Sequence, residues 1–195
     1  MSVPIVVLAA GASRRLGEPK ALARIAGRTA LEHLVGAAHA AGSVTVYVVV
    51  GAHERQIRAA LPDLREVLWV QSPDWKRGRS ASILAGLSAA GSNRDVMIAP
   101  IDVPLVRSST IRALLSGWRE HGAPSRGWLA PFIQGKSTKR YGHPVVVGKD
   151  LLAEIDPDAP SKNCARMRSH SWAYAPTMPR CSTTWIHPRI SSVCE

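Results

Sequence analysis

The sequence has no apolar run of 18 or more residues, which is about the shortest stretch that spans a bilayer as a helix. Met1–Ile5 lacks the basic segment with which a secretory signal begins, and the apolar run Val3–Leu8 is too short for the core of one. We therefore expect no membrane-spanning segment and a cytoplasmic protein in which Val3–Leu8 is a buried strand.

Cysteine and aromatic residues are scarce. The three cysteines all lie in the last 32 positions. Their spacing fits no zinc motif, and an odd number argues against a framework of disulfides. Aromatic residues make up 5% of the chain, and the arginines are scattered along it. Neither distribution favours a nucleic-acid surface.

Acidic residues are outnumbered by basic ones, 14 to 25, and the formal net charge is +11. This balance favours an anionic ligand such as a nucleotide or a nucleic acid, although a solvated basic surface has the same composition. Because aromatic residues are few, we rank a nucleotide above a nucleic acid. The length of 195 residues and the hydrophobic content of 46% fit one globular domain.

The first 155 residues alternate between short apolar strands and segments with helical spacing. Such a pattern predicts an α/β fold in which helices cover both faces of a mainly parallel sheet. Ligands of these folds bind beyond the carboxyl ends of the strands. The expected strands are Val3–Leu8, Val44–Val50, Glu66–Val70, Val96–Ala99, Trp128–Ile133 and Pro144–Val147, and the expected helices are Ala30–Ala41 (capped by Thr29), Glu54–Leu61, Ser80–Ala90, Ser108–His121 and Lys149–Ile155.

The first strand leads into a loop of small residues, Ala9–Ser13, which is followed by the cationic residues Arg15 and Lys20. Small side chains let backbone amides approach phosphate oxygens, and the Ser13 hydroxyl adds a donor. Arg15 and Lys20 supply positive charge for a triphosphate. The pattern is neither a Walker loop nor a GxGxxG motif, and a flexible turn with surface arginines is the alternative.

This segment resembles the signature of the MobA-like NTP transferases, the molybdopterin nucleotidyltransferase group, written roughly L-A-x-G-x-S-x-R-x-G-x-x-K. The resemblance implies a three-layer, Rossmann-like nucleotidyltransferase fold, an NTP substrate and Mg²⁺. It also implies catalytic roles for Arg15, Lys20 and Asp102. The residues that fill the signature are Leu8, Ala9, Gly11, Ser13, Arg15, Gly17 and Lys20. The residues implied in nucleotide or acceptor binding are Leu8, Ala9, Ala10, Gly11, Ala12, Ser13, Lys20, Ser82 and His143.

Ala10 occupies the variable position of the signature. A Gly-Gly pair at this point resembles the guanylyl enzymes, whereas Ala-Gly resembles the cytidylyl enzymes. Ala10-Gly11 therefore implies CTP in preference to GTP. A methyl group that narrows the base pocket against a purine is the physical reason we expect.

Asp102 follows the expected strand Val96–Ala99 and stands two residues before Pro104. A carboxylate at a strand end suits Mg²⁺, which takes few protein carboxylates and completes its shell with phosphate oxygens. Family members resemble the chain here in carrying D-x-P, which implies that Asp102 is a metal ligand. An aspartate that opens a turn is the alternative.

Two further motifs resemble the family. The pattern W-x-x-G-x-x-x-S-x-x-x-G at Trp75–Gly86 places Ser82 in the first turn of a helix, where its hydroxyl could meet a base or phosphate; an ordinary helix serine and a core tryptophan are the alternatives. The triplet Gly142-His143-Pro144 resembles the acceptor-side motif, so His143 is expected to contact the acceptor phosphate. A histidine that packs at a strand start is the alternative.

The resemblance ends near residue 155. Family members continue with a Gly-Ala-Arg helix and a D-I-D-T-P-E-D segment that resembles the source of a second metal ligand, and this chain has neither. We predict a nucleotidyltransferase domain at 1–158 and an atypical tail at 159–195, either frame-shifted or poorly ordered. One choice of codons for Thr184–Ile190, read one frame away, encodes Leu-Asp-Pro-Pro-Glu-Asp, which is similar to the missing segment.

The predicted reaction transfers a nucleoside monophosphate from an NTP, CTP before GTP, to a phosphate-bearing acceptor and releases pyrophosphate. By resemblance the acceptor is molybdopterin or the molybdenum cofactor, and a molybdoenzyme is a partner; membranes and nucleic acids are not expected partners. A catalytically impaired cofactor-binding or chaperone module for molybdoenzyme maturation is the alternative. A transferase for a sugar or polyol phosphate and a basic nucleic-acid binder are further candidates.

Overall fold

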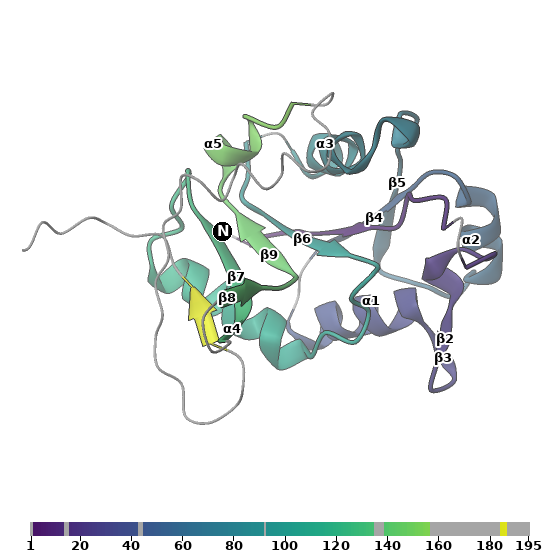
Figure 1. Ribbon diagram of the computed structural model, residues 1–195, viewed down its shortest axis with the longest axis horizontal. Helices are drawn as coiled ribbons and strands as arrows, with labels where there is room; N and C mark the ends of the chain where they lie inside the picture. The colour runs from purple at the N-terminus through teal and green to yellow at the C-terminus, as the bar shows by residue number, and fades with distance from the viewer. Residues whose placement is uncertain are drawn as a thin grey trace, which may run out of the picture.

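The computed structural model describes residues 2–13, 16–42, 45–91, 93–134, 139–156 and 184–186. Its centre is an eight-stranded sheet (Figure 1). The strands are β1 (Ile5–Leu8), β4 (Val46–Val50), β5 (Val67–Gln71), β6 (Val96–Pro100), β7 (Trp128–Gln134), β8 (Lys139–Tyr141), β9 (Val145–Val147) and β10 (Thr184–Ile186).

The strands lie in the order β10-β7-β9-β6-β1-β4-β5, with β8 paired to β7. The four strands β6, β1, β4 and β5 run parallel to one another. On the other side of β6, the strands β9, β7, β8 and β10 pair in antiparallel fashion. The predicted α/β fold with a mainly parallel sheet is confirmed, and the antiparallel strands extend it on one side.

Helices cover both faces of the sheet. In Figure 1, α3 and α5 lie above it and α1 and α4 lie below it. A short hairpin and two 3-10 turns join these elements. The helices are α1 (Ala30–Ala40), α2 (Glu54–Ala60), α3 (Arg79–Ala90), α4 (Ser108–Glu120) and α5 (Lys149–Leu152), the turns are η1 (Lys20–Leu22) and η2 (Trp75–Arg77), and the hairpin strands are β2 (Arg24–Ile25) and β3 (Arg28–Thr29).

The two faces of β1 build two separate cores. Ile5 and Val7 belong to the cluster formed with α1 and α4. Val6 and Leu8 belong to the cluster formed with α3. Successive side chains of a strand point to opposite faces, so a strand covered on both faces must be apolar throughout. This explains the continuous apolar run that marks the strand in the sequence.

Thr29 caps α1 as predicted. Its hydroxyl accepts a hydrogen bond of 3.2 Å from the Glu32 amide, and the Glu32 carboxylate accepts one of 2.7 Å from the Thr29 amide. This reciprocal pair is a capping box. The hydrogen bonds from Thr29 lower the pKa of Glu32, because they favour the ionised carboxylate.

Gly86 lets α3 approach the sheet closely. A Cβ atom at this position would overlap Val6 Cγ1 and lie 3.0 Å from Val49 Cγ2. The last glycine of the Trp75–Gly86 pattern therefore has a packing role. Across the residues described, no helix has the length and apolar character needed to cross a membrane.

Candidate active site

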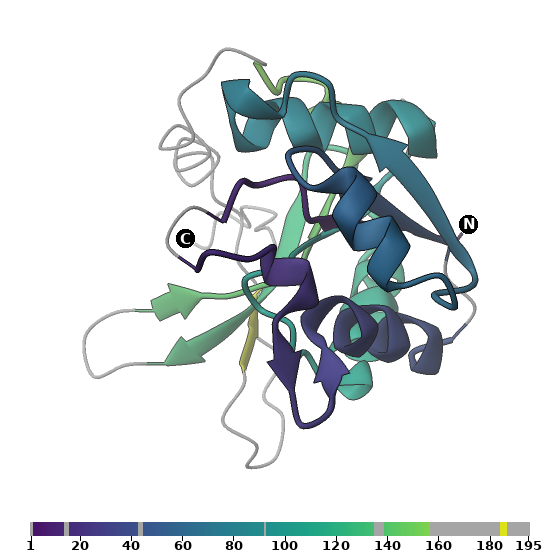
Figure 2. The same cartoon turned by 90° about the vertical axis from the view of Figure 1, so that its right-hand side faces the viewer.

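The carboxyl ends of β1, β4 and β6 bring three loops together. The Ala9 amide donates to Val49 O at 2.8 Å, and the Ile101 amide donates to Leu8 O at 3.2 Å. These two bonds continue the sheet pairing past the end of β1 and fix the start of the loop at 9–13 next to Asp102. Figure 2 views the molecule from this side, with the loop after β1 in dark purple.

The loop at 9–13 presents unused amides. Among the residues described, the amides of Gly11, Ala12 and Ser13 donate to no other backbone or side-chain group. The amide of Ala9 is already taken by the sheet, and Leu8 and Ala9 are buried. The backbone amides of Gly11, Ala12 and Ser13 are therefore available to an anion. Leu8 and Ala9 pack in the core beneath the loop and do not face a ligand.

The Ala10 methyl does not face an open pocket. Ala10 is 3% exposed, and its side chain belongs to the core cluster on the α3 side of the sheet, together with Leu8 and Ile83. We expected the Ala10 methyl to narrow the base pocket and so to favour CTP. That reason is wrong, because the methyl faces the core. The preference itself stays a prediction from the resemblance.

Ser13 folds the chain back towards Lys20. Its φ of +48° lies in the left-handed region, which is uncommon for residues other than glycine. Ser13 Oγ accepts a hydrogen bond of 3.0 Å from the Lys20 amide, and Ser13 O accepts one of 2.9 Å from the Leu16 amide. The hydroxyl thus fixes the backbone of Lys20 and keeps its own hydrogen for a further acceptor.

Lys20 and Asp102 meet although 82 positions separate them in the chain. Lys20 Nζ lies 2.6 Å from Asp102 Oδ1, and the two side chains are 48% and 47% exposed. The pair sits where the loop after β1 meets the loop after β6. Both charged groups are open to a ligand that approaches this edge of the sheet.

The donor set around Asp102 fits a cation that arrives with an anionic substrate. A hard carboxylate oxygen already accepts a cation there, the Lys20 ammonium. Among the residues described, no group of three His, Cys, Asp or Glu side chains could hold a metal ion. Mg²⁺ binds through one or two carboxylates plus substrate phosphates, so a single carboxylate suffices for it and would not suffice for a structural metal.

His143 lies near this pair. Its Nδ1 atom is buried and has no hydrogen-bond partner among the residues described. Burial lowers the pKa of His143, the positive charge of Arg79 lowers it further, and the negative charge of Asp102 raises it. The lowered pKa favours the neutral form of the ring.

Ser82 is committed to its own helix. It is 5% exposed, and its hydroxyl donates to Gly78 O at 3.5 Å. A serine that bonds back four residues along its helix satisfies itself and does not point at a ligand. The structure therefore does not bring Ser82 into the site, whereas Gly78, with a φ of +116°, starts α3 in a conformation that glycine favours.

Sequence reasoning missed three residues at this site. His53 Nε2 donates to Ala12 O at 3.0 Å and so holds the tip of the loop. Gly51 lets β4 end close to the loop, because a Cβ there would lie 2.8 Å from Ala10 O and 2.7 Å from Trp75 Cβ. Arg79 acts on His143 through its charge. The signal that could have found His53 and Gly51 is their position directly after the buried strand β4.

The predicted catalytic residue Arg15 lies outside the described residues. So does the tail at 159–195, except the backbone of β10. The boundary at residue 158 stays a prediction.

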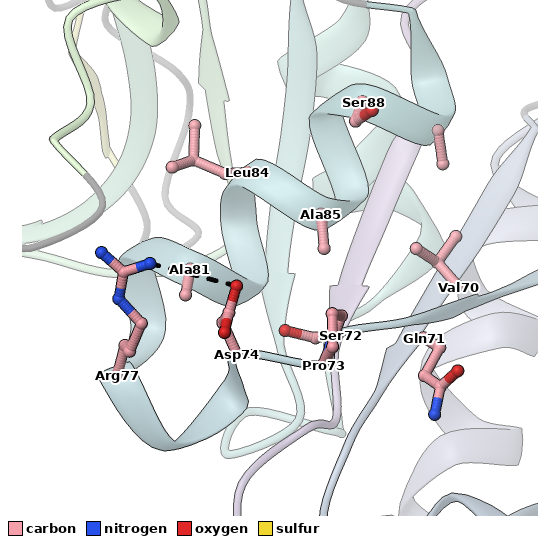
Figure 3. Close-up of a pocket in the computed structure, with 11 residues that line it drawn as sticks. Val70, Gln71, Ser72, Pro73, Asp74, Arg77, Ala81, Leu84, Ala85 and Ser88 are labelled. Carbon is pink, nitrogen blue, oxygen red and sulfur yellow. Dashed lines mark ion pairs between the residues drawn. The ribbon is translucent and has the colours of Figure 1, made fainter.

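A pocket of about 450 Å³ lies beside α3 (Figure 3). Ser72, Leu84 and Ala85 line it. Asp74 and Arg77 also line it, and they form an ion pair of 4.0 Å. Its lining contains no residue of the loop at 9–13 and neither Lys20 nor Asp102. The pocket is therefore separate from the site around Lys20.

The comparison with known families decides the kind of protein. The sequence model of the MobA-like NTP transferase domain matches residues 5–172. The chain belongs to the MobA-like NTP transferase family. Its fold and family are those of nucleotidyltransferases, as the loop at 9–13 predicts. The match ends inside the segment 159–195.

Two curated relatives differ in how much of their length the chain covers. Nicotine blue oxidoreductase of Paenarthrobacter nicotinovorans is 33% identical over 151 residues, which are 77% of this chain and 72% of that protein. The bifunctional protein GlmU of Xanthobacter autotrophicus is 31% identical over 155 residues, or 78% of this chain. The chain spans about a third of that GlmU protein, 34%.

Two solved structures show the same fold. A nucleotidyl transferase from Methanothermobacter thermautotroptrophicus (Mth528) is 30% identical, with a TM-score of 0.62, over 78% of this chain and 74% of that one. Rv0371c of Mycobacterium tuberculosis H37Rv is 25% identical, with a TM-score of 0.62, over 80% of this chain and 76% of that one.

Proposed function

We propose that this chain transfers a nucleoside monophosphate, CMP in preference to GMP, from an NTP to a phosphate-bearing acceptor and releases pyrophosphate. The acceptor is molybdopterin or its molybdenum-bearing form, and the reaction is cytoplasmic. The observation that carries the proposal is the 2.6 Å contact between Lys20 Nζ and Asp102 Oδ1, beside a loop with unused amides. A triphosphate needs such a combination of donors and charge.

The residues of the chain work by positioning and by neutralising charge. An acceptor phosphate oxygen attacks the α-phosphorus, the bond from that phosphorus to the bridging oxygen breaks, and pyrophosphate leaves. The amides of Gly11–Ser13 and the Lys20 ammonium hold phosphate oxygens and stabilise the charge on the leaving group. Arg15 is proposed to add a second cation. No covalent intermediate with the protein is required.

Asp102 is the proposed Mg²⁺ ligand. Bound there, Mg²⁺ would neutralise negative charge on the phosphate groups. His143, whose lowered pKa favours the neutral ring and which senses the charge of Asp102, is the proposed contact for the acceptor phosphate. A neutral imidazole donates a hydrogen bond to a phosphate without adding a charge to the site.

Exposed apolar side chains in the segments that carry Lys20, Asp102 and His143 support an acceptor with a flat ring system. Among the residues described, the exposed large hydrophobic side chains number five, and four of them lie within four positions of Lys20, Asp102 or His143. Exposed apolar side chains in the segments of a site favour a ligand with a face that can pack against them. A pterin is polar at its edges but has a flat ring face, which suits such side chains better than a hydroxyl-rich sugar does. The four are Leu16, Val103, Leu105 and Tyr141.

Pyrophosphate release tests the proposal. The purified chain is incubated with molybdopterin, Mg²⁺ and either CTP or GTP, and pyrophosphate is measured over time. Loss of one such charged group costs about 2.7–4 kcal/mol of barrier, so Lys20→Met and Asp102→Asn should each lower turnover at least about a hundredfold. Lys149→Met, which removes a positive charge at the opposite end of β6, should keep the wild-type rate. Full activity in both site variants would refute the assignment.

Two other outcomes identify other functions. Binding of the pterin without pyrophosphate release would favour the cofactor-binding or chaperone module, with a molybdoenzyme as its partner. The 33% identity to a protein named an oxidoreductase favours redox chemistry as a second candidate. Reduction of nicotine blue by an added reductant that depends on this protein, with no pyrophosphate formed from either NTP, would favour that candidate.

We further propose that the atypical tail at 159–195 is read in a shifted frame, although the family match reaches residue 172 and β10 pairs with β7. The absence of the expected acidic segment supports this. Sequencing the gene tests it. A related protein whose own in-frame tail matches residues 159–195 would refute it.

A further inference from the structure

The ammonium of Lys20 contacts one carboxylate oxygen of Asp102, the proposed metal ligand. Lys20 Nζ lies 2.6 Å from Asp102 Oδ1. The backbone of Lys20 is fixed by its amide bond to Ser13 Oγ, and Lys20 begins η1. The Lys20 side chain therefore extends to Asp102 from a backbone that is held in place by hydrogen bonds.

A divalent cation and this ammonium compete for the same carboxylate. Two cations beside one half-exposed carboxylate repel each other. Without a triphosphate, no group of three His, Cys, Asp or Glu side chains among the described residues is present to hold the added cation. With a triphosphate, the phosphate oxygens offer the ammonium a stronger set of acceptors.

We propose that Lys20 closes Asp102 to divalent cations in the nucleotide-free protein, and that a nucleoside triphosphate opens it by drawing the ammonium away. The metal ion consequently binds together with the nucleotide or after it. The inference rests on the proposed function, because it assigns the triphosphate to the loop at 9–13. It adds an order of binding and a second task for Lys20, which is to keep the empty site free of metal.

The test is a Mn²⁺ titration of the folded protein without nucleotide, in which free Mn²⁺ is measured by electron paramagnetic resonance. Lys20→Met should bind Mn²⁺ about tenfold more tightly than the wild type, because the variant loses both the ion pair and the repulsion. Lys20→Arg, which keeps a cation, and Lys149→Met, which removes a remote one, should bind like the wild type. Asp102→Asn placed in the Lys20→Met protein should abolish the gain.

The proposal is overturned if Lys20→Met binds Mn²⁺ no more tightly than the wild type. It is equally overturned if Lys149→Met shows the same gain or if the gain survives Asp102→Asn. A second titration with a non-hydrolysable CTP analogue should raise the Mn²⁺ affinity of the wild type more than that of Lys20→Met. Failure of the transferase function would appear as no pyrophosphate release, while the nucleotide-free difference between the two proteins would remain.

Discussion

Gly51 directly follows β4, at a point where there is no room for a side chain. A Cβ atom would lie 2.7 Å from Trp75 Cβ and 2.8 Å from the carbonyl oxygen of Ala10. Ordinary contacts between carbon atoms are about 3.5–4.0 Å, so one or both neighbours of an alanine must retreat by more than about half an ångström. The Ala10 carbonyl belongs to the proposed phosphate loop, and it also accepts a hydrogen bond from the Ala52 amide.

The expected magnitudes follow from this overlap. Overpacking of this kind costs about 1–3 kcal/mol of folding free energy. A misplacement of about 1 Å in a positioned site costs about a hundredfold in rate, so a shift of half that size should lower kcat/KM for the nucleotide about tenfold. Gly51→Ala is therefore expected to lose both stability and catalytic efficiency.

Gly86→Ala is the matched control. It also adds a methyl group where a Cβ would overlap a neighbour, but that neighbour is Val6 in the core. Urea denaturation measures the loss of stability in both variants, and pyrophosphate release measures kcat/KM. Gly86→Ala should lose stability and keep kcat/KM within about twofold of the wild type, because it does not touch the loop. If Gly51→Ala is destabilised but keeps the wild-type kcat/KM, the loop at 9–13 does not hold the nucleotide.

Two further predictions concern titrating groups. Thr29→Ala should lower the free energy of unfolding by about 1 kcal/mol in urea denaturation, since it removes the cap of α1. Because the pKa of Glu32 is lowered in the folded protein, the capping box stabilises the fold fully at pH values above the ordinary pKa of a glutamate. It is lost as pH falls through the folded pKa, so the difference between the two proteins should shrink in acid; a difference that grows in acid would contradict the capping box. An NMR titration should find the pKa of His143 below its ordinary value of 6.5, lower still in Asp102→Asn and higher in Arg79→Met. The neutral ring favours folding above the ordinary pKa, and this contribution falls as pH drops from that value towards the folded pKa. Unchanged values in both variants would mean that neither charge acts on the ring.

The strands and helices of the parallel part of the sheet could be predicted, because each shows the hydrophobic pattern of one type of element. β4 is β-branched almost throughout, and α1 begins at a threonine cap, so their positions are recovered to within about two residues. The hairpin of β2 and β3 could not be predicted, because two-residue strands show no hydrophobic period. Its turn also contains Ala26 at a φ of +47°, where glycine or asparagine is the usual residue. The antiparallel pairing of β7 and β9 depends on long-range contacts that an apolar run does not encode.

The site could be predicted in outline for a topological reason. Leu8 and Pro100 are register partners on the parallel neighbours β1 and β6, so the loops that follow them must meet. That pairing places the start of the loop at 9–13 and Asp102 at the same edge. The sequence carries no sign that Ser13 would hold the Lys20 backbone or that His53 would reach Ala12, because both depend on the exact path of the loops.

Ala10→Gly separates two explanations of the nucleotide preference. The Ala10 methyl is buried in the α3-side core, so its removal should lower the free energy of unfolding by about 1–2 kcal/mol, from lost burial and from added backbone freedom. The ratio of kcat/KM for CTP to that for GTP should stay within about threefold of the wild-type ratio, because a methyl that faces the core cannot select a base directly. A methyl that lines the base pocket contributes about tenfold or more to discrimination. A tenfold shift towards GTP, measured by pyrophosphate release with each nucleotide, would therefore place the Ala10 side chain against the base and refute its core role.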